Sequence, residues 1–532
     1  MFSTNKNRVL YSLLAIVAAL SSAEAAPSIK NRTMVPKLVV NILIDQFRSD
    51  YMKAFMPLYG EDGFKKLLEG GKVYTQAEYS QSHPDIASAA ASLSTGTSPL
   101  NHGIIARQWL DRLTLRPIFC VDDKKFIGCA TKDCSSPVYL SVSTIGDELK
   151  VATEGKALVY AIAPFRETAI LTAGHAANGA VWIDDYTGNW CSTSYYGSLP
   201  SWAVVRSQYN SLSTQLNNLV WEPSSDLVGT FSYFLSGGMK SPFKHKFSGD
   251  SRFVSYKTSG LVNGEVIATV KDCLNSTTIG NDGITDYLAI TLYAGNFEHS
   301  PIDVVPMELQ DTYVRLDKAI ADLLSTVDTK VGLDHSLLVF TSTGYTNDES
   351  SDISKYRIPS GVFDMQRAAA LLNMYLVAIY GQGQYVESCF STQLYLNHKL
   401  LEDKQINISE LLNRAQDFLF QLNGVKDVYT SQRLLQGAWT PGINKIRNGY
   451  NQNYSGDITI EISPGWRYLN EDTGENKLVR ESYVPFPIIF YGYGIVPEVV
   501  STPIAVDYIA PTLSSIMRIR APNACKNAPL SL

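Results

Sequence analysis

Short apolar runs alternate with segments of helical periodicity along most of the chain. The apolar runs have the length of buried strands and lie at Leu38–Ile44, Ala157–Ala163, Tyr287–Leu292, Leu337–Thr341 and Ile488–Tyr491. Between them, segments such as Leu309–Leu324 place apolar residues at helical spacing, with charged residues in between. This alternation predicts an α/β fold with a mainly parallel sheet between helices. Further helices are expected at Asp62–Leu68, Ile86–Leu93, Thr144–Val151, Phe363–Leu376 and Asp507–Arg518.

Length and charge narrow the class of protein. The chain has 532 residues, of which 45% are apolar, and this is ample for a large core. The formal net charge is -6 and the sequence contains no long basic run. We therefore do not expect a nucleic acid as a partner.

The N-terminus has the pattern of an export signal. Lys6 and Arg8 precede the apolar stretch Val9–Leu20, and small residues follow around Ala25. This pattern predicts a signal peptide over residues 1–25, cleaved near Ala25. The apolar stretch is short for a bilayer, and no later segment predicts a transmembrane helix. We expect a secreted or periplasmic protein.

Seven cysteines suit an exported chain, and an odd number leaves at least one thiol without a partner in the same chain. Cys120, Cys129 and Cys134 lie close together in a polar segment without a C-x-x-C pair. A local disulfide within this trio is favoured over a metal site.

Several longer motifs carry a family resemblance. They are VVNILID (39–45), SHPDIASAAASLSTGTSPLNHGI (82–104), AILTAGHAANGAVWIDDYTG (169–188), NGYNQNYSGDITIEISPGW (448–466) and YVPFPIIFYG (483–492). Together they resemble the alkaline phosphatase superfamily, in the branch of bacterial phosphate-irrepressible alkaline phosphatases and type I phosphodiesterases–nucleotide pyrophosphatases. The resemblance implies one α/β domain over residues 36–530. Insertions at 181–285 and 355–457 would form a cap over the carboxyl ends of the strands.

The resemblance also implies a two-zinc site with a Thr or Ser nucleophile, and most of its positions are altered here. Asp45 matches the first metal-ligand Asp. An ungapped count puts Ile86 at the nucleophile position, and one deletion puts Ala87 there. Neither side chain can attack phosphorus. Ser88 is a weak candidate for a displaced nucleophile, and a hydroxyl at the start of a helix is the favoured alternative.

The remaining metal-ligand positions are replaced as well. Thr343 and Gly344 stand where the family has an adjacent Asp and His, and Tyr483 stands at its last His. Asn296 and Ser300 replace an Asp and a His, with His299 one residue away. Asn is a weak neutral ligand for zinc. His299 is thus a minor candidate ligand beside Asp45.

The phosphate-binding positions have changed too. Phe165 and Glu167 replace a Lys-x-Arg pair, and Arg107 replaces an Asn. Arg107 and Arg166 remain candidates for binding an anion. We expect a cleft at the carboxyl ends of the strands where charged groups pair, lined by Asp45, Asp85, Arg107, Arg166, Glu167, Asn296, His299 and Tyr483. Asp45→Asn would then lower stability, because a buried Arg would lose its counter-charge. His102 and His175 match family positions outside the metal site, and we interpret them as structural.

Two hypotheses follow. The leading one is an inactive pseudoenzyme that acts as a binding or envelope-complex component, with no cofactor expected. The alternative is a metal-dependent phosphatase or phosphodiesterase with a relocated site on Asp45, Asp85 and His299, holding residual zinc. The partner would be an unknown protein, or a glycan or lipid headgroup. For such a ligand, aromatic residues of the cap offer a surface unless they pack as core: Trp182, Trp190, Tyr195, Tyr196 and Trp202.

Overall fold

The computed structural model describes residues 35–229, 242–302, 304–347, 359–437, 440–470, 475–479 and 484–532. The predicted signal peptide with its cleavage point near Ala25 lies outside the described residues, as does Tyr483. All the elements below belong to one compact unit, Pro36–Leu532.

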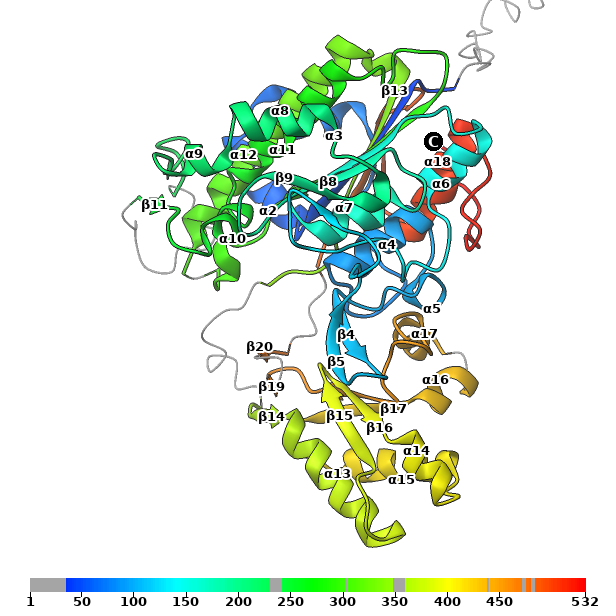
Figure 1. Ribbon diagram of the computed structural model, residues 1–532. Helices are drawn as coiled ribbons and strands as arrows, with labels where there is room; N and C mark the ends of the chain where they lie inside the picture. Colours follow the sequence, from blue (N-terminus) through cyan, green and yellow to red (C-terminus); the bar gives the residue numbers. More distant parts are fainter. Residues whose placement is uncertain are drawn as a thin grey trace, which may run out of the picture. The chain divides into compact units, whose positions relative to one another are not determined.

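A ten-stranded sheet forms the centre of this unit (Figure 1). Its order is β22 (Glu498–Val500), β2 (Lys72–Tyr74), β21 (Ile488–Gly492), β13 (Ser336–Ser342), β1 (Leu38–Asp45), β12 (Asp286–Tyr293), β7 (Val159–Ile162), β8 (Gly179–Ile183), β9 (Trp190–Thr193) and β6 (Gly128–Cys129). The neighbours β13, β1, β12, β7 and β8 run parallel, whereas β21 and β9 are antiparallel to their partners. The predicted mainly parallel sheet is confirmed, and each of the five predicted strands overlaps an observed one.

Helices cover both faces of the sheet because the central strands bury alternate side chains on opposite sides (Figure 1). Val40 and Ile42 of β1 belong to one core, and Val39 and Leu43 belong to the other. The first core contains α2 (Ser49–Ala54), α3 (Lys66–Gly70), α8 (Ser201–Tyr209), α11 (Val262–Ser276) and α12 (Pro306–Lys330). The second contains α4 (Ile86–Thr95), α6 (Ile145–Ala152), α7 (Arg166–Ala173) and α18 (Ile509–Met517).

The second predicted insertion has a sheet and a core of its own (Figure 1). The sheet order is β15 (Val386–Phe390), β16 (Gln393–Leu396), β18 (Ile458–Ile462) and β17 (Val425–Thr430). Helices α13 (Met365–Tyr380) and α15 (Ile408–Leu419) share its apolar core. Smaller helices complete this region, α14 (His398–Asp403), α16 (Ser431–Gln436) and α17 (Pro441–Asn448). The predicted helix Phe363–Leu376 begins later, because Val362–Asp364 forms the short strand β14.

Part of the first predicted insertion joins the main sheet, and its role as a cap stays a prediction. Its β8 and β9 extend the main sheet, and α11 packs against β12. Trp182, Trp190 and Trp202 are buried in the two main cores. Tyr195 and Tyr196 donate hydrogen bonds to the carbonyl oxygens of His175 and Gly174, respectively. The interpretation of these residues as core is favoured over a binding surface, because the three tryptophans are buried and Tyr196 packs against the second core. The boundaries of the two insertions stay a prediction.

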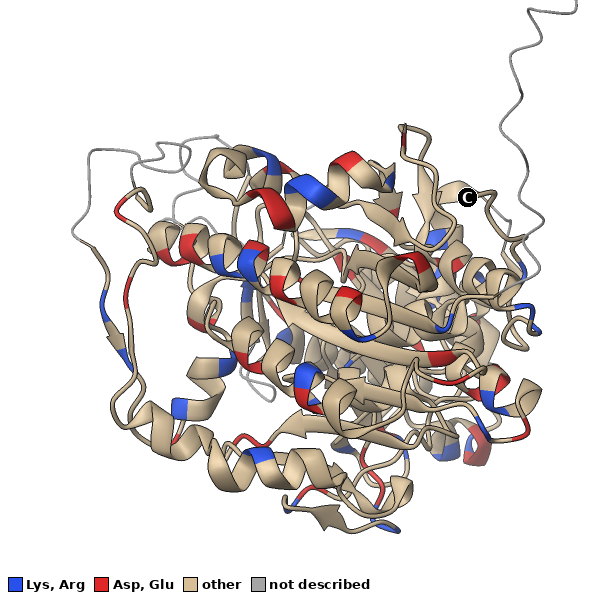
Figure 2. Cartoon of the chain, turned by 90° about the horizontal axis from the view of Figure 1, so that it is seen from above, with Lys and Arg blue, Asp and Glu red and all other residues tan. Residues whose placement is uncertain are grey.

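Surface charge and cysteines complete the description. Lys and Arg are interspersed with Asp and Glu over the helices in the view of Figure 2. Within the described ranges, no helix is both long and apolar enough to cross a membrane. Cys120, Cys129 and Cys134 form no disulfide with one another in the structure, which contradicts the predicted local disulfide. Cys120 is packed into the second core, and the thiol of Cys129 instead contacts the carbonyl oxygen of Gly197.

Candidate functional site

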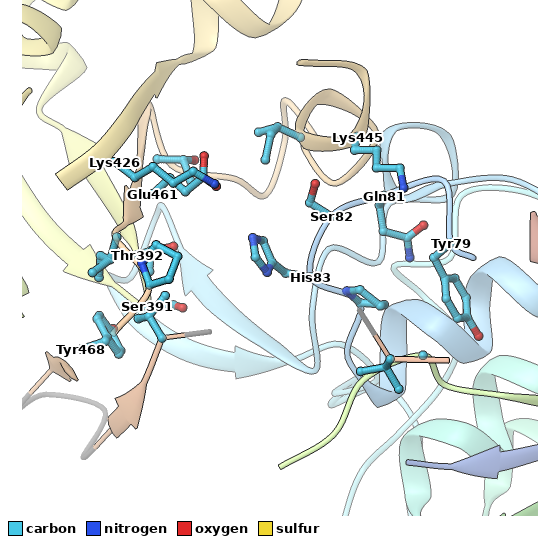
Figure 3. Close-up of a pocket in the computed structure, with 18 of the residues that line it drawn as sticks. Tyr79, Gln81, Ser82, His83, Ser391, Thr392, Lys426, Lys445, Glu461 and Tyr468 are labelled. Carbon is cyan, nitrogen blue, oxygen red and sulfur yellow. The ribbon is translucent and has the colours of Figure 1, made fainter. Parts of the chain in front are cut away.

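A cleft lies at the edge of the main sheet where β1, β12 and β13 end. These strands are parallel, so their carboxyl ends meet at one edge. The cleft has a volume of about 560 Å³ and is lined by Asp45, Asp85, Arg107 and His299, together with Phe390, Ser391, Gln393 and Tyr395 of the second insertion. A second cavity of about 750 Å³ shares His83, Ser391 and Lys477 with it (Figure 3). Of the residues predicted to converge here, Arg166 and Asn296 do not line the cleft.

Hydroxyl groups hold the carboxylate of Asp45, which ends β1 and is only 1% exposed. The Thr343 hydroxyl donates to Oδ1 over 3.0 Å, and the Gln46 amide lies 3.5 Å from Oδ2. Tyr345 donates a further side-chain hydrogen bond. Burial raises the pKa of Asp45 to about 6, although these hydrogen bonds act in the opposite direction. The family resemblance implies a pair of metal ligands at Thr343 and Gly344. In this chain the Thr343 hydroxyl donates a hydrogen bond to Asp45 instead.

Asp85 and Ser88 together cap the start of α4. The amide and the hydroxyl of Ser88 each donate to Asp85 Oδ1 over 2.8 Å, and the Asp85 amide lies 3.0 Å from the Ser88 hydroxyl oxygen. The backbone amide of Arg107 donates to the other carboxylate oxygen. Such reciprocal bonds satisfy the free amides at a helix start. This geometry favours the capping role for Ser88, which is buried. Ile86, at one of the two candidate nucleophile positions, lines the cleft.

Arg107 faces the cleft but is already paired with a buried carboxylate. Its Nε lies 2.9 Å from Glu167 Oε1, and the two side chains are 52% and 3% exposed. Burial alone would raise the pKa of Glu167, but the charges of Arg107 and Arg166 lower it overall. Arg166 contacts Asp122 at 3.0 Å and Asp133 at 3.7 Å. The expectation that both arginines face an anion is therefore corrected, because Arg166 pairs with carboxylates of a distant loop.

The loop after β12 uses its polar groups to hold itself together. Asn296 is buried and donates from Nδ2 to the carbonyl oxygen of Ser300 over 2.9 Å. Asn347 Nδ2 lies 3.1 Å from His299 Nδ1. Burial and the nearby charges of Arg107 and Lys477 lower the pKa of His299, which favours a neutral ring that accepts this hydrogen bond.

The residues present do not fit a pair of zinc ions. Zinc sites need three or four His, Cys, Asp or Glu ligands around one point. Within the described ranges, no group of three such side chains lies close enough to share a metal ion. Asp45, Asp85 and His299 line the same cleft, but both carboxylates and His299 Nδ1 already have hydrogen-bond partners in the chain. Asp45 matches a ligand position of the implied zinc site, but the other ligands of that site are missing among these residues.

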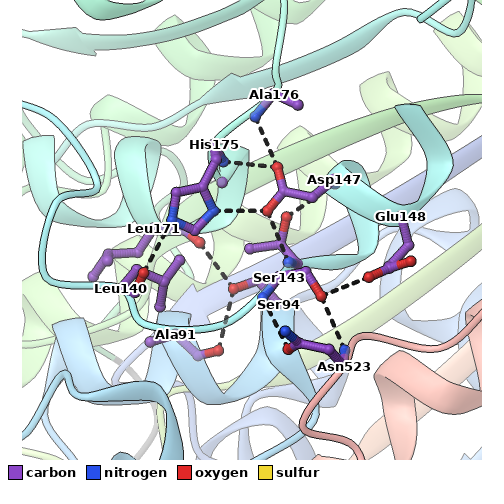
Figure 4. Close-up of polar contacts among 12 residues, drawn as sticks. Ala91, Ser94, Leu140, Ser143, Asp147, Glu148, Leu171, His175, Ala176 and Asn523 are labelled. Atoms are coloured by element: carbon purple, nitrogen blue, oxygen red, sulfur yellow. Dashed lines mark hydrogen bonds and ion pairs between the residues drawn. The ribbon is translucent and has the colours of Figure 1, made fainter. Parts of the chain in front are cut away.

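The two histidines interpreted as structural are fully hydrogen-bonded, which confirms that prediction. His102 is buried between the Ser92 hydroxyl at Nε2 and the Ile104 amide at Nδ1, and burial lowers its pKa to about 3. His175 contacts Asp147 Oδ2 at 2.9 Å through Nδ1 and the Leu140 carbonyl oxygen at 3.0 Å through Nε2 (Figure 4). Two acceptors at the two ring nitrogens suit a doubly protonated, charged ring.

Sequence analysis did not single out Gln46 and Tyr345. The backbone amide of Gln46 donates a hydrogen bond to Thr343 Oγ1 over 2.8 Å. The side-chain Oε1 of Gln46 accepts a hydrogen bond from the backbone amide of Asn347 over 2.9 Å. Both residues adjoin the ends of predicted strands, which is the one sequence signal that could have marked them.

The chain combines a mainly parallel sheet, a cleft at its carboxyl edge, an N-capped helix that begins there and a second, inserted sheet. These features define an α/β domain with its site at the carboxyl ends of the strands. The family model of type I phosphodiesterase / nucleotide pyrophosphatase matches residues 39–483, and the chain is a member of this family.

Individual relatives resemble the chain over nearly its whole length. Alkaline phosphatase PafA of Elizabethkingia meningoseptica is 26% identical, over 93% of this chain and 94% of that protein. Alkaline phosphatase PhoV of Synechococcus elongatus is 27% identical over 95% and 94%, respectively. A Myroides odoratus protein named calcium-transporting ATPase is 28% identical over 93% and 94%. A crystal structure of wild type PafA superposes with a TM-score of 0.80 at 24% identity, covering 93% of this chain and 98% of that one. This likeness confirms the predicted fold.

Proposed function

We propose that the chain is a catalytically inactive member of its family that acts as an exported binding protein or as a component of an envelope complex. One observation carries the proposal. Each of the three carboxylates at the cleft, Asp45, Asp85 and Glu167, is bound by donors of the chain itself. Donors in those places compete with a metal ion for the same carboxylate oxygens.

The altered positions support the same proposal on chemical grounds. Ile86 and Ala87 carry no group that can attack phosphorus, and Ser88 is engaged in the cap of α4. Metal ions in phosphoryl transfer generate the nucleophile and stabilise the leaving oxygen, each worth several kcal/mol. A cleft without both functions would not turn over phosphate esters at a useful rate.

The test is a paired measurement of zinc binding and turnover. The mature chain is incubated with excess zinc, desalted and assayed for metal content. It is then assayed with p-nitrophenyl phosphate and bis-p-nitrophenyl phosphate beside PafA. We expect well under one zinc per chain and a kcat/KM at least ~10⁴-fold below that of PafA, equivalent to about 5.5 kcal/mol of barrier.

The hydrolase alternative predicts the opposite result. Relatives named alkaline phosphatase make it a reasonable second candidate. It requires zinc-dependent turnover that Asp45→Ala abolishes. A displaced nucleophile would also make the turnover sensitive to Ser88→Ala. Turnover within ~100-fold of PafA with this sensitivity to Asp45→Ala would overturn the proposal.

A further inference from the structure

The second cavity is a built site that the proposed function does not use. Its volume of about 750 Å³ falls in the range of small-molecule sites. One wall is formed by residues 77–84, which lead from β3 (Ala77–Glu78) towards α4. The opposite wall is the open face of the second insertion's sheet (Figure 3). Segments far apart in the sequence therefore enclose one space.

The sheet wall presents a fixed polar group. Along β18, Ile458, Ile460 and Ile462 belong to the insertion's core, so Thr459 and Glu461 lie on the opposite face. The Glu461 carboxylate is held by Lys426 Nζ at 2.9 Å and by the Tyr429 hydroxyl at 3.0 Å. Hydrogen bonds of this kind fix the direction of the carboxylate before any ligand arrives.

The wall formed by residues 77–84 carries His83. Figure 3 shows its ring between the wall with Lys426, Thr392 and Ser391 and the wall with Gln81 and Tyr79. The His83 side chain makes no hydrogen bond to any of the residues that the structure describes, although it is exposed to both cavities. Its backbone φ is +52°, in the left-handed region that non-glycine residues rarely adopt.

The chemistry of the walls indicates the ligand. The lining holds two ion pairs, Lys426 with Glu461 and Lys445 with Glu78 at 2.7 Å, beside a third lysine, so the cavity offers charged groups of both signs. Hydroxyls of Ser82, Ser391, Thr392 and Thr459 add groups that both donate and accept. Tyr429 and Tyr468 supply aromatic surface. This mixture suits a neutral molecule with many hydroxyls and apolar C–H faces.

We propose that this cavity binds a carbohydrate, with Glu461 accepting hydrogen bonds from its hydroxyls and His83 contacting it from the opposite wall. The site lies outside the cleft between Asp45 and Arg107 and does not depend on whether that cleft hydrolyses phosphate esters. A neutral sugar requires neither a metal ion nor a net charge in the cavity.

The test measures binding of cellobiose, lactose and chitobiose to the mature chain by saturation-transfer NMR and calorimetry. We expect at least one to bind in the millimolar range or tighter. Glu461→Gln should weaken that binding about tenfold, because hydrogen bonds to a charged acceptor are the stronger ones. His335→Ala removes an exposed histidine elsewhere and should leave the affinity unchanged.

The decisive variant is His83→Gly, because glycine adopts a positive φ without strain. A ligand-contacting role predicts an affinity about tenfold weaker with a melting temperature equal to or above that of the parent. A structural role predicts a lower melting temperature with unchanged affinity, which would overturn the proposal. Failure of all three sugars to bind would overturn it as well, as would binding that survives both Glu461→Gln and His83→Gly. None of these outcomes involves phosphate ester turnover, so this test and that of the inactive cleft can fail separately.

Discussion

Two buried carboxylates of the main domain, Asp147 and Asp45, are held in different ways. Asp147, at the start of α6, is bound by the backbone amides of Thr144, His175 and Ala176 and by the His175 ring. Burial alone would raise its pKa, but these partners lower it overall. Asp45 has only hydroxyl and side-chain amide donors, and burial raises its pKa to about 6.

The two sets of donors distinguish Asp147, which stabilises the fold, from Asp45, which lines the cleft. A buried carboxylate is stable as an anion when amides and a positive charge surround it. Asp147 has that surrounding, and it fixes the junction between α6 and the turn after α7. Asp45 lacks it, because its donors are hydroxyls and a side-chain amide.

The largest loss of stability should come from removing the charge of Asp147. Asp147→Asn places an amide where His175 and three backbone amides all donate, so at least one donor loses its acceptor. We expect the free energy of unfolding to fall by about 3 kcal/mol, measured by urea denaturation. Glu154→Gln, at an exposed carboxylate, serves as the matched control. A loss no larger than that of the control would end the distinction between the two carboxylates.

The next effect concerns the ion pair at the cleft. Arg107→Met leaves Glu167 buried without the guanidinium that contacts it at 2.9 Å. We expect a loss of about 2 kcal/mol, because breaking one side of a buried pair leaves the other charge uncompensated. In the double variant Arg107→Met/Glu167→Met, much of the loss should be recovered. Equal losses in the single and double variants would contradict the pairing as the cause.

A smaller effect depends on pH. Burial alone would lower the pKa of His175, but Asp147 and the Leu140 carbonyl raise it overall. A raised folded pKa stabilises the protein fully below the unfolded value of about 6.5, and the stabilisation is lost as pH rises through the folded pKa. His175→Gln should therefore lower the melting temperature at ~pH 5.5, with a difference that shrinks by ~pH 9. His335→Gln, at an exposed ring, should show no such trend. A constant difference across this range would rule out a charged His175.

Sequence reasoning located the central strands because buried parallel strands are nearly continuous apolar runs. Val39–Asp45 and Leu337–Thr341 fixed the register that places Thr343 beside Asp45. The strands β8 and β9 were not predicted, because they are short and their aromatic residues resemble a recognition surface as much as a core. The direction of Arg166 could not be predicted, because its partners come from a loop more than thirty residues earlier in the chain.

The smallest expected change in the free energy of unfolding is that of Asp45→Asn. Its sign shows whether a cation balances this carboxylate. The expectation of a stability loss rested on a buried Arg as counter-charge, but the arginine at the cleft pairs with Glu167. The Asn side-chain oxygen can still accept from the Thr343 hydroxyl, and a neutral amide is buried in place of a carboxylate. Because the folded pKa of Asp45 is raised, the parent loses stability as pH rises through about 6, whereas the variant does not. At ~pH 8 we expect the variant to be as stable as the parent or up to ~1 kcal/mol more stable, by urea denaturation. Thr343→Val should then destabilise the parent more than it destabilises the Asp45→Asn variant, because the hydroxyl bonds most strongly to a charged acceptor. A loss above ~1 kcal/mol for Asp45→Asn would instead mean that a cation balances this carboxylate, which is the result that the relocated-metal alternative requires.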